Sequence, residues 1–220
     1  GPPLPADEVA YLRALYDAEV QSWDAALATL LGRLAALGVA ESTVVIVTAD
    51  HGEEFQEHGM LKHGRHLYDE SLHVPLVIAG PAVPAGRATE QAEGVDLFPT
   101  VAALLGAPAP TGLPGQDLLA GRTERPVFSE TRYGDAGGAS APLVSVRTAG
   151  WKLIHVPAPG HDQLYDLVHD PGEHEDRAGM ADAGFLTALL AAWAPAPPPV
   201  HAASGDPALG EKLRALGYVE

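Results

Sequence analysis

The stretch Val44-Val45-Ile46-Val47-Thr48-Ala49-Asp50-His51-Gly52-Glu53-Glu54 joins an uninterrupted run of β-branched residues to a carboxylate, an imidazole and a glycine. A continuous apolar run of this length predicts a strand covered on both faces, as in a parallel sheet between helix layers. Open α/β sheets place their chemistry just beyond the carboxyl ends of such strands. Asp50 and His51 occupy that position, and Gly52 allows the backbone to turn sharply after them.

Two interpretations of this dipeptide remain open at this point. A carboxylate next to an imidazole is a mixed ligand set that suits a divalent metal ion. Alternatively, Asp50 caps a following helix and His51 is a solvated loop residue.

The next twenty-odd residues form a histidine-rich loop that is punctuated by glycine and ends at a second apolar strand. Five of the ten histidines fall between positions 51 and 73. The order and spacing of the motifs resemble the sulfatase branch of the alkaline phosphatase superfamily. The matching motifs are Thr48-Ala49-Asp50-His51-Gly52-Glu53, Glu57-His58-Gly59, Lys62-His63-Gly64, and Leu67-Tyr68-Asp69 followed by Val74-Pro75-Leu76.

This resemblance implies a set of functional residues. Asp50 and His51 would ligate a divalent metal ion. Ca²⁺ is the first expectation, with Mn²⁺ or Zn²⁺ as alternatives because imidazole favours softer metals than an all-oxygen site does. His63 would contact the ester oxygens or the leaving group, where imidazole can act as a general acid near neutral pH. Lys62 and His66 would bind the substrate and are the alternatives to His63.

A simpler explanation competes for the remaining loop histidines. His58, His66 and His73 are predicted to be solvated or locally hydrogen-bonded rather than catalytic.

Composition excludes several classes of partner. The formal charge of −16 and the isoelectric point near 4.8 argue against affinity for nucleic acid or anionic membranes. The chain has no cysteine, so it cannot form a thiolate metal site or a disulfide. We find no apolar window long enough for a membrane span. Compartment is not indicated, although bacterial members of the resembling family are often exported.

The first 120 residues are expected to form the α/β part of an alkaline-phosphatase-like three-layer sandwich. Apolar spacing predicts one long helix over residues 7–37, or two helices joined by a bend, ended by Gly38. The Trp and Leu stripe of this segment is expected to pack against the sheet as core. The strand at 43–48 leads to a second strand at 76–79. A helix follows over 95–106, with Asp96 as its cap rather than a metal ligand.

Residues 121–220 are expected to form a small α+β subdomain. Gly and Pro turns separate candidate strands at 126–130, 143–148, 151–156 and 163–167, which predicts an antiparallel sheet covered by a helix at 185–193. A stiff Pro-rich linker at 195–199 and a closing helix at 209–218 follow. The stretch from Leu164-Tyr165-Asp166-Leu167 to Asp170-Pro171-Gly172-Glu173 resembles a turn near the end of many sulfatases.

The family's nucleophile motif, Cys/Ser-x-Pro-x-Arg, is absent, and the nearest match at Ser140-Ala141-Pro142 lacks the arginine. We therefore expect the chain to be the C-terminal half of a sulfuric ester hydrolase for a sulfated small molecule or glycan. On its own it should be inactive and marginally stable or sticky, because the N-terminal half that would cover its apolar faces is missing. Two alternatives stay open: a phosphonate monoester hydrolase or phosphoethanolamine transferase of the same superfamily, and a non-catalytic binding module.

Overall fold

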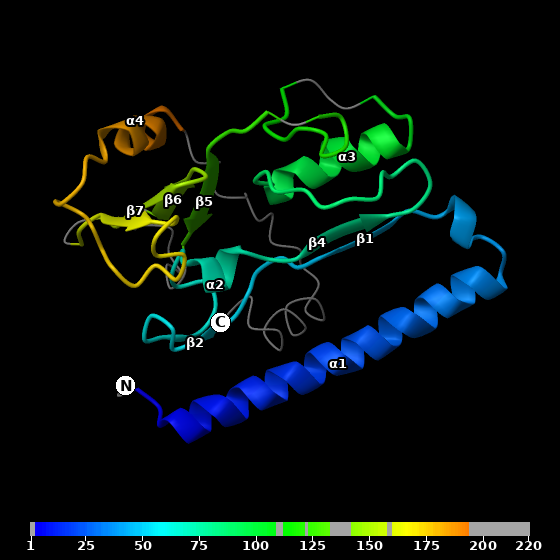
Figure 1. Ribbon diagram of the computed structural model, residues 1–220, viewed down its shortest axis with the longest axis horizontal. Coiled ribbons are helices and arrows are strands. Elements are labelled where there is room, and N and C mark those ends of the chain that lie inside the picture. Colours follow the sequence, from blue (N-terminus) through cyan, green and yellow to red (C-terminus); the bar gives the residue numbers. More distant parts are fainter. Residues whose placement is uncertain (1–2, 109–111, 122, 133–141, 158–159, 194–220) are drawn as a thin grey trace, which may run out of the picture.

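The computed structural model describes residues 3–108, 112–121, 123–132, 142–157 and 160–193 (Figure 1). Within them, the helices are Ala6–Ala36 (α1), Asp69–Leu72 (α2), Leu97–Leu104 (α3) and Gly184–Ala192 (α4), with short 3-10 helices at Ala40–Ser42 (η1) and Gly94–Asp96 (η2). The strands are Val45–Thr48 (β1), Glu54–Phe55 (β2), Leu61–Lys62 (β3), Leu76–Ala79 (β4), Val127–Thr131 (β5), Leu143–Arg147 (β6), Trp151–His155 (β7) and Gln163–Asp166 (β8). None of the helices in these ranges is long and apolar enough to cross a membrane.

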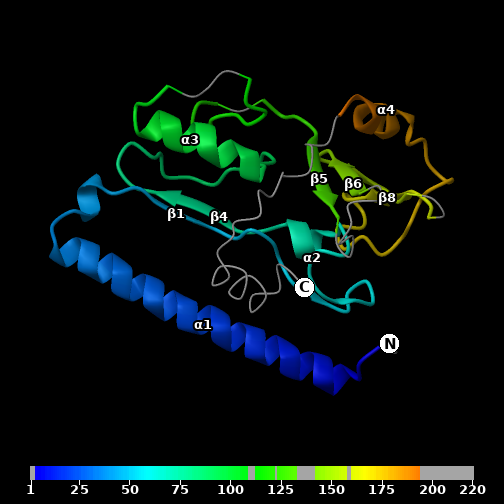
Figure 2. The ribbon, with the colours of Figure 1, turned by 180° about the vertical axis from the view of Figure 1, so that it is seen from behind.

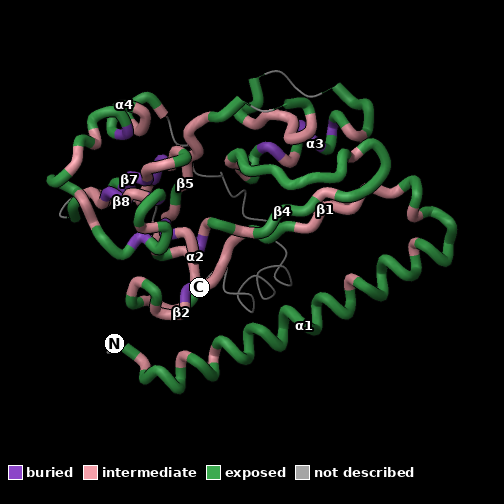
Figure 3. The backbone as a smooth tube through the Cα atoms, viewed as in Figure 1, coloured by how far each residue is buried: buried purple, intermediate pink, exposed green. Residues whose placement is uncertain are grey.

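The structure decides between one helix and two joined by a bend: α1 is a single helix, and it ends where Gly38 adopts a φ of +71°. The prediction that its apolar stripe is core is wrong for this chain, since none of its residues is buried and Trp23 is 52% exposed. Figure 3 shows α1 as an almost continuously exposed element. Its best contact is the edge-on packing of Tyr16 against Phe55, with ring centroids 5.4 Å apart. The stripe is exposed because little of the described chain reaches it.

The strands β1 and β4 pair with each other in a two-stranded sheet, and they run antiparallel with Val45 opposite Ala79. The predicted parallel, doubly buried strand is therefore wrong. A parallel pair needs a connection that crosses from one end of the sheet to the other, whereas here β4 begins at Leu76 directly opposite Thr48, where β1 ends. In Figures 1 and 2 the pair lies between α1 on one side and α3 on the other, which gives a helix, sheet, helix order of layers.

The 3-10 helix η2, which leads directly into α3, begins with a capping box. Asp96 is completely buried, and its carboxylate accepts a hydrogen bond from the backbone N–H of Glu93 while Glu93 caps in return. Asp96 also accepts from the backbone N–H of Gln116 and pairs with Arg125. Asp96 stands at the N-cap position of α3, but its side chain makes no capping bond to that helix and instead closes the capping box of η2, so the prediction is right in position only.

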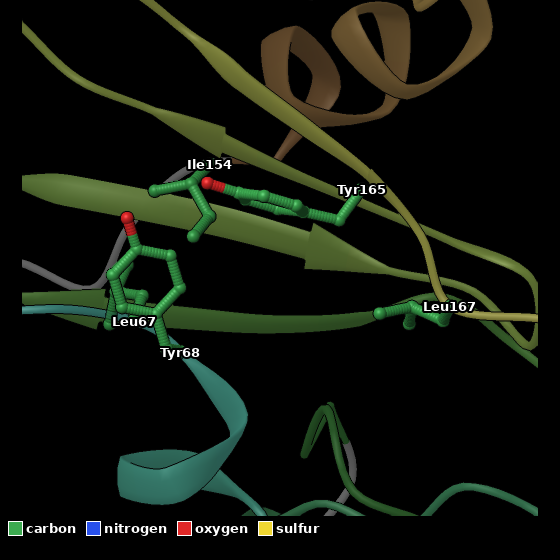
Figure 4. Close-up of a cluster of buried hydrophobic side chains, with 5 residues drawn as sticks. All are labelled: Leu67, Tyr68, Ile154, Tyr165 and Leu167. Carbon is green, nitrogen blue, oxygen red and sulfur yellow. The ribbon is translucent and has the colours of Figure 1, made fainter. Parts of the chain in front are cut away.

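The four strands β5 to β8 form an antiparallel sheet in chain order, each within two residues of its predicted bounds. Both faces of this sheet are covered. On one face, α4 packs over a buried cluster of Val146, Leu153, Leu164 and Leu186. On the other face, Leu67 and Tyr68, just before α2, pack against Ile154, Tyr165 and Leu167 (Figure 4).

The histidine-rich loop is therefore anchored to the C-terminal sheet by its own apolar residues.

The predicted linker at 195–199 and helix at 209–218 lie outside the described residues.

Candidate active site

Asp50 and His51 follow the carboxyl end of β1, where the sequence predicts chemistry. The backbone N–H of His51 donates to Asp50 Oδ1 over 3.1 Å. The His51 Nδ1 atom lies 2.8 Å from the carbonyl oxygen of Gly52, which can only accept, so Nδ1 carries the proton. The other ring nitrogen, Nε2, then presents its lone pair and lies 3.8 Å from Asp50 Oδ2. No helix begins at Asp50, so the helix-cap interpretation does not apply.

His63 lies directly against this pair. The rings of His51 and His63 stack with their centroids 3.8 Å apart and an interplanar angle of 25°. His63 Nδ1 is 3.0 Å from Glu53 Oε2, so the carboxylate accepts a hydrogen bond from the Nδ1–H group, and Nε2 stays available. Glu53 orients the ring in this way, a role that sequence reasoning missed although Glu53 stands inside the Asp-His-Gly-Glu motif.

Gly52 is required here by a close approach of two backbone segments. Its N–H donates to the carbonyl oxygen of Ser71 over 2.8 Å. A Cβ at this position would lie 1.9 Å from the carbonyl oxygen of Glu70, which is a backbone clash. Any larger residue would separate the Asp50–His51 turn from the end of α2.

Lys62 and His66 occupy different environments. Lys62 is exposed in β3 with a φ of 74°, a left-handed conformation that is uncommon outside glycine. His66 instead faces inward, with Nδ1 3.2 Å from Oε2 of Glu54. Glu54 is 1% exposed, and its other oxygen accepts from the hydroxyl of Ser71 over 3.1 Å. The prediction of a locally hydrogen-bonded histidine is confirmed for His66.

A shallow groove of about 290 Å³ adjoins His66, between the loop and the C-terminal sheet. It is lined by Arg65, His66, Leu67, Tyr68, Leu143, Ile154, Val156 and Gln163. The lining combines apolar side chains with the polar side chains of Arg65, His66 and Gln163.

The other two loop histidines also match the simpler explanation. His73 is exposed after α2. The imidazole of His58 is hydrogen-bonded through both ring nitrogens, to Glu70 and to the backbone of Glu173.

A buried ion-pair network joins the loop to the sheet, and sequence reasoning missed it. Lys152 is fully buried, with Nζ 2.9 Å from Asp69 Oδ1 and 2.8 Å from Glu173 Oε1. Arg147 reaches the other oxygen of Asp69 over 3.3 Å. Burial would raise the pKa of Asp69, but Lys152 and Arg147 outweigh it and hold that pKa below its usual value.

In the same network, the pKa of Glu173 is shifted upward, opposite to the shift of Asp69. Burial is the largest influence on it and raises the pKa of Glu173 despite the nearby Lys152 ammonium. The signal that could have located this network is the alternation of side chains in β7. Lys152 shares a sheet face with Ile154, which is core, so its charge had to be paired.

Asp50 and His51 fit a shared divalent cation as two ligands, since a carboxylate oxygen and an imidazole lone pair face the same region. Across the described ranges, no group of three or more His, Cys, Asp or Glu side chains gathers to hold a metal ion. These two residues therefore account for only part of a coordination shell.

The fold and this arrangement define a class of protein: a mixed α/β chain of the alkaline-phosphatase-like type, with acid and imidazole groups beyond a strand. Among solved structures, a phosphonate monoester hydrolase from Silicibacter pomeroyi aligns with a TM-score of 0.72 and 26% identity, covering 86% of this chain and 41% of that one. A 2-O GAG sulfatase aligns with a TM-score of 0.63 and 25% identity, covering 84% and 39%.

The family model for sulfatases matches residues 5–107. Arylsulfatase K from Bos taurus is 32% identical over 180 residues, which is 76% of this chain and 33% of that protein. Choline-sulfatase from Rhizobium meliloti (strain 1021) is 31% identical over 189 residues, covering 80% and 36%. The chain belongs to the sulfatase family. It spans about a third of the length of these curated relatives.

Proposed function

We propose that this chain provides part of the active site of a metal-dependent hydrolase that cleaves sulfate esters. The observation that carries the proposal is the ring stack that holds His63 beside the Asp50–His51 pair, at the end of β1. The names of the relatives, arylsulfatase and choline-sulfatase, support a sulfated small molecule or glycan as the substrate.

Asp50 Oδ2 and His51 Nε2 are the atoms that would hold the metal ion. A divalent cation supplies neutralisation of the charge that develops on the sulfuryl oxygens. Ca²⁺ is our first choice, while the imidazole ligand favours testing Mn²⁺ and Zn²⁺ as well. The hydrogen bond from His51 Nδ1 to the Gly52 carbonyl fixes the tautomer that a ligand needs.

His63 is our choice for the proton-transfer residue. Because Glu53 holds the proton on Nδ1, the Nε2 atom is the one that would exchange a proton with the leaving oxygen. The exposed Lys62 ammonium would pair with the sulfate oxygens, and His66 would contact the rest of the substrate from the rim of the groove.

We further propose that the nucleophile and the remaining metal ligands come from an N-terminal half of a longer protein. Under this proposal, residues 1–120 complete the catalytic α/β core and residues 121–220 form an accessory subdomain. The 220-residue chain alone should show no turnover of an aryl sulfate. Hydrolysis by the purified chain would contradict this part of the proposal.

Phosphonate monoester hydrolysis is the second candidate activity, because an enzyme of that name aligns with a TM-score of 0.72.

The decisive experiment expresses the complete reading frame and compares aryl sulfate, aryl phosphate and aryl phosphonate esters with Ca²⁺, Mn²⁺ or Zn²⁺ added. We expect sulfate hydrolysis, abolished in Asp50→Ala and reduced by roughly a hundredfold or more in His63→Ala. His73→Ala is the matched control, since His73 is an exposed histidine of the same loop and should leave the rate unchanged. Preference for the phosphonate ester would select the second candidate.

A further inference from the structure

The charge of His58 can be read from its hydrogen bonds. Its Nδ1 atom lies 2.6 Å from Glu70 Oε1, and its Nε2 atom lies 2.9 Å from the backbone carbonyl oxygen of Glu173. A carbonyl oxygen only accepts, and an ionised carboxylate only accepts. Both ring nitrogens must therefore donate, which a neutral imidazole cannot do. With Glu70 ionised, this geometry fits an imidazolium ring paired with the Glu70 carboxylate.

The surroundings of His58 suit a buried cation. The His58 and Glu70 side chains are only 11% and 15% exposed, so solvent screens their attraction weakly. The ring of Tyr68 stacks on His58 at a centroid distance of 3.7 Å and an angle of 13°, which presents a π face to the charge. His174 is the nearest opposing group, with its ring centroid 5.7 Å away.

The contacts of His58 join segments that are far apart in sequence. His58 lies in the turn of the β2–β3 hairpin, and Glu173 lies 115 residues away, after β8. Glu173 adopts a φ of 57°, and its side chain accepts from the backbone N–H of Asp69 over 2.6 Å while it pairs with Lys152. One turn of the C-terminal subdomain thus holds both the hairpin and the start of α2.

We propose that His58 is a positioning residue: as an imidazolium ring, it ties the β2–β3 hairpin, and with it Lys62 and His63, to the turn at Glu173. The importance of Lys62 and His63 rests on the proposed function. The charged link between the hairpin and the C-terminal subdomain does not rest on it, and it can be tested without any measurement of turnover.

The first test is nitrogen-15 NMR of the histidine side chains in the full 220-residue chain at about pH 7.5, with His58→Leu used to identify the His58 signals. We expect both His58 ring nitrogens to be protonated at this pH, and the signals of the exposed His169 serve as the comparison. In Glu70→Gln, which keeps the side-chain shape, His58 should become neutral with its proton on Nε2. A neutral His58 in the unmodified chain would overturn the proposal.

The second test is hydrogen exchange in the β2–β3 hairpin. In His58→Leu we expect the hairpin amides that form its cross-turn bonds, Gln56 and Gly59, to exchange at least about tenfold faster. His169→Leu is the matched control, because it removes an exposed histidine–carboxylate pair with Asp166 and should leave the hairpin unchanged. Unchanged exchange in folded His58→Leu would refute the positioning role, even if the ring proves to be charged.

Discussion

Lys152 shows how strongly one buried charge can depend on its partners. Its ammonium group is fully buried between Asp69 and Glu173. In Lys152→Met, Arg147 still pairs with Asp69, but Glu173 keeps a buried carboxylate without a cation. We expect the free energy of unfolding to fall by roughly 3–5 kcal/mol, measured by urea denaturation at neutral pH.

The control for this prediction is Arg177→Met, because Arg177 pairs with the exposed Glu175 over 2.8 Å. Exposed pairs contribute little, so the loss should stay below about 1 kcal/mol. The double variant Lys152→Met with Glu173→Gln should recover part of the stability, since it no longer buries an unpaired charge. Equal effects of Lys152→Met and Arg177→Met would contradict this account of the network.

The contribution of His58 to the stability of the chain is also expected to depend on pH. Burial alone would lower the pKa of His58, but the hydrogen bonds to Glu70 and to the Glu173 carbonyl outweigh it, and the pKa lies above the ordinary value of 6.5. A raised pKa in the folded state means that the contribution of His58 to stability is complete below about pH 6.5 and is lost as the pH rises through the folded pKa. The difference in urea midpoint between the unmodified chain and His58→Leu should therefore shrink as the pH rises above 6.5.

The titration of the neighbouring Asp69 and Glu173 must be distinguished from that of His58 in this urea-midpoint comparison. The pKa of Asp69 is lowered, so its contribution is lost only as the pH falls below about 3.8. Burial raises the pKa of Glu173, and Glu173 contacts His58, so the comparison is repeated in a Glu173→Gln background to separate the two groups. A midpoint difference that stays constant or grows with pH would count against the imidazolium link.

At the scale of elements, the exposed apolar residues of α1 predict that the chain self-associates. Its exposed large apolar residues include Tyr11, Leu15, Val20, Trp23 and Leu30. A helix that exposes a continuous apolar stripe is prone to association. We expect the chain to self-associate as its concentration rises, and Trp23→Gln with Leu30→Gln to reduce this association in sedimentation velocity. Gln21→Ala on the same helix is the control and should change nothing. A concentration-independent monomer would refute this prediction.

The secondary structure could largely be predicted from the sequence, because caps, turn residues and periodicity are local signals. Gly38 ends α1, and Gly or Pro residues separate the strands of the C-terminal sheet. Strand direction could not be predicted in this way. The run at Val45–Thr48 has the composition of a parallel strand, yet its partner is antiparallel because the chain re-enters the sheet at the end where β1 leaves it.

The candidate site was predictable to the same extent. The positions of Asp50, His51 and His63 follow from the motif, but the stacking of the two rings and the roles of Glu53 and Glu54 depend on a β2–β3 hairpin with strands of only two residues. Such short strands carry no periodic signal. The partners of Lys152 come from positions 83 and 21 residues away, and no local pattern encodes contacts of that kind.

For the whole molecule, the uneven distribution of the core predicts uneven stability. The two buried apolar clusters lie on the faces of the C-terminal sheet, whereas β1 and β4 are only partly buried. We expect the amides of β6 and β7 to exchange with deuterium much more slowly than those of β1 and β4. The measurement labels the intact chain with deuterium, digests it and determines the mass of each peptide. Equal protection of the two sheets would show that the parts unfold as one unit.

The complete burial of Lys152 has one further chemical consequence. The chain contains three lysines: Lys62 is exposed beside the candidate site, Lys152 is sealed inside the C-terminal sheet, and Lys212 lies outside the described residues. An acylating reagent would therefore modify Lys62 while the protein is folded and would reach Lys152 only after the loop has detached from the sheet. The fraction of molecules acylated at Lys152 would thus report how many molecules have opened at least once during the reaction.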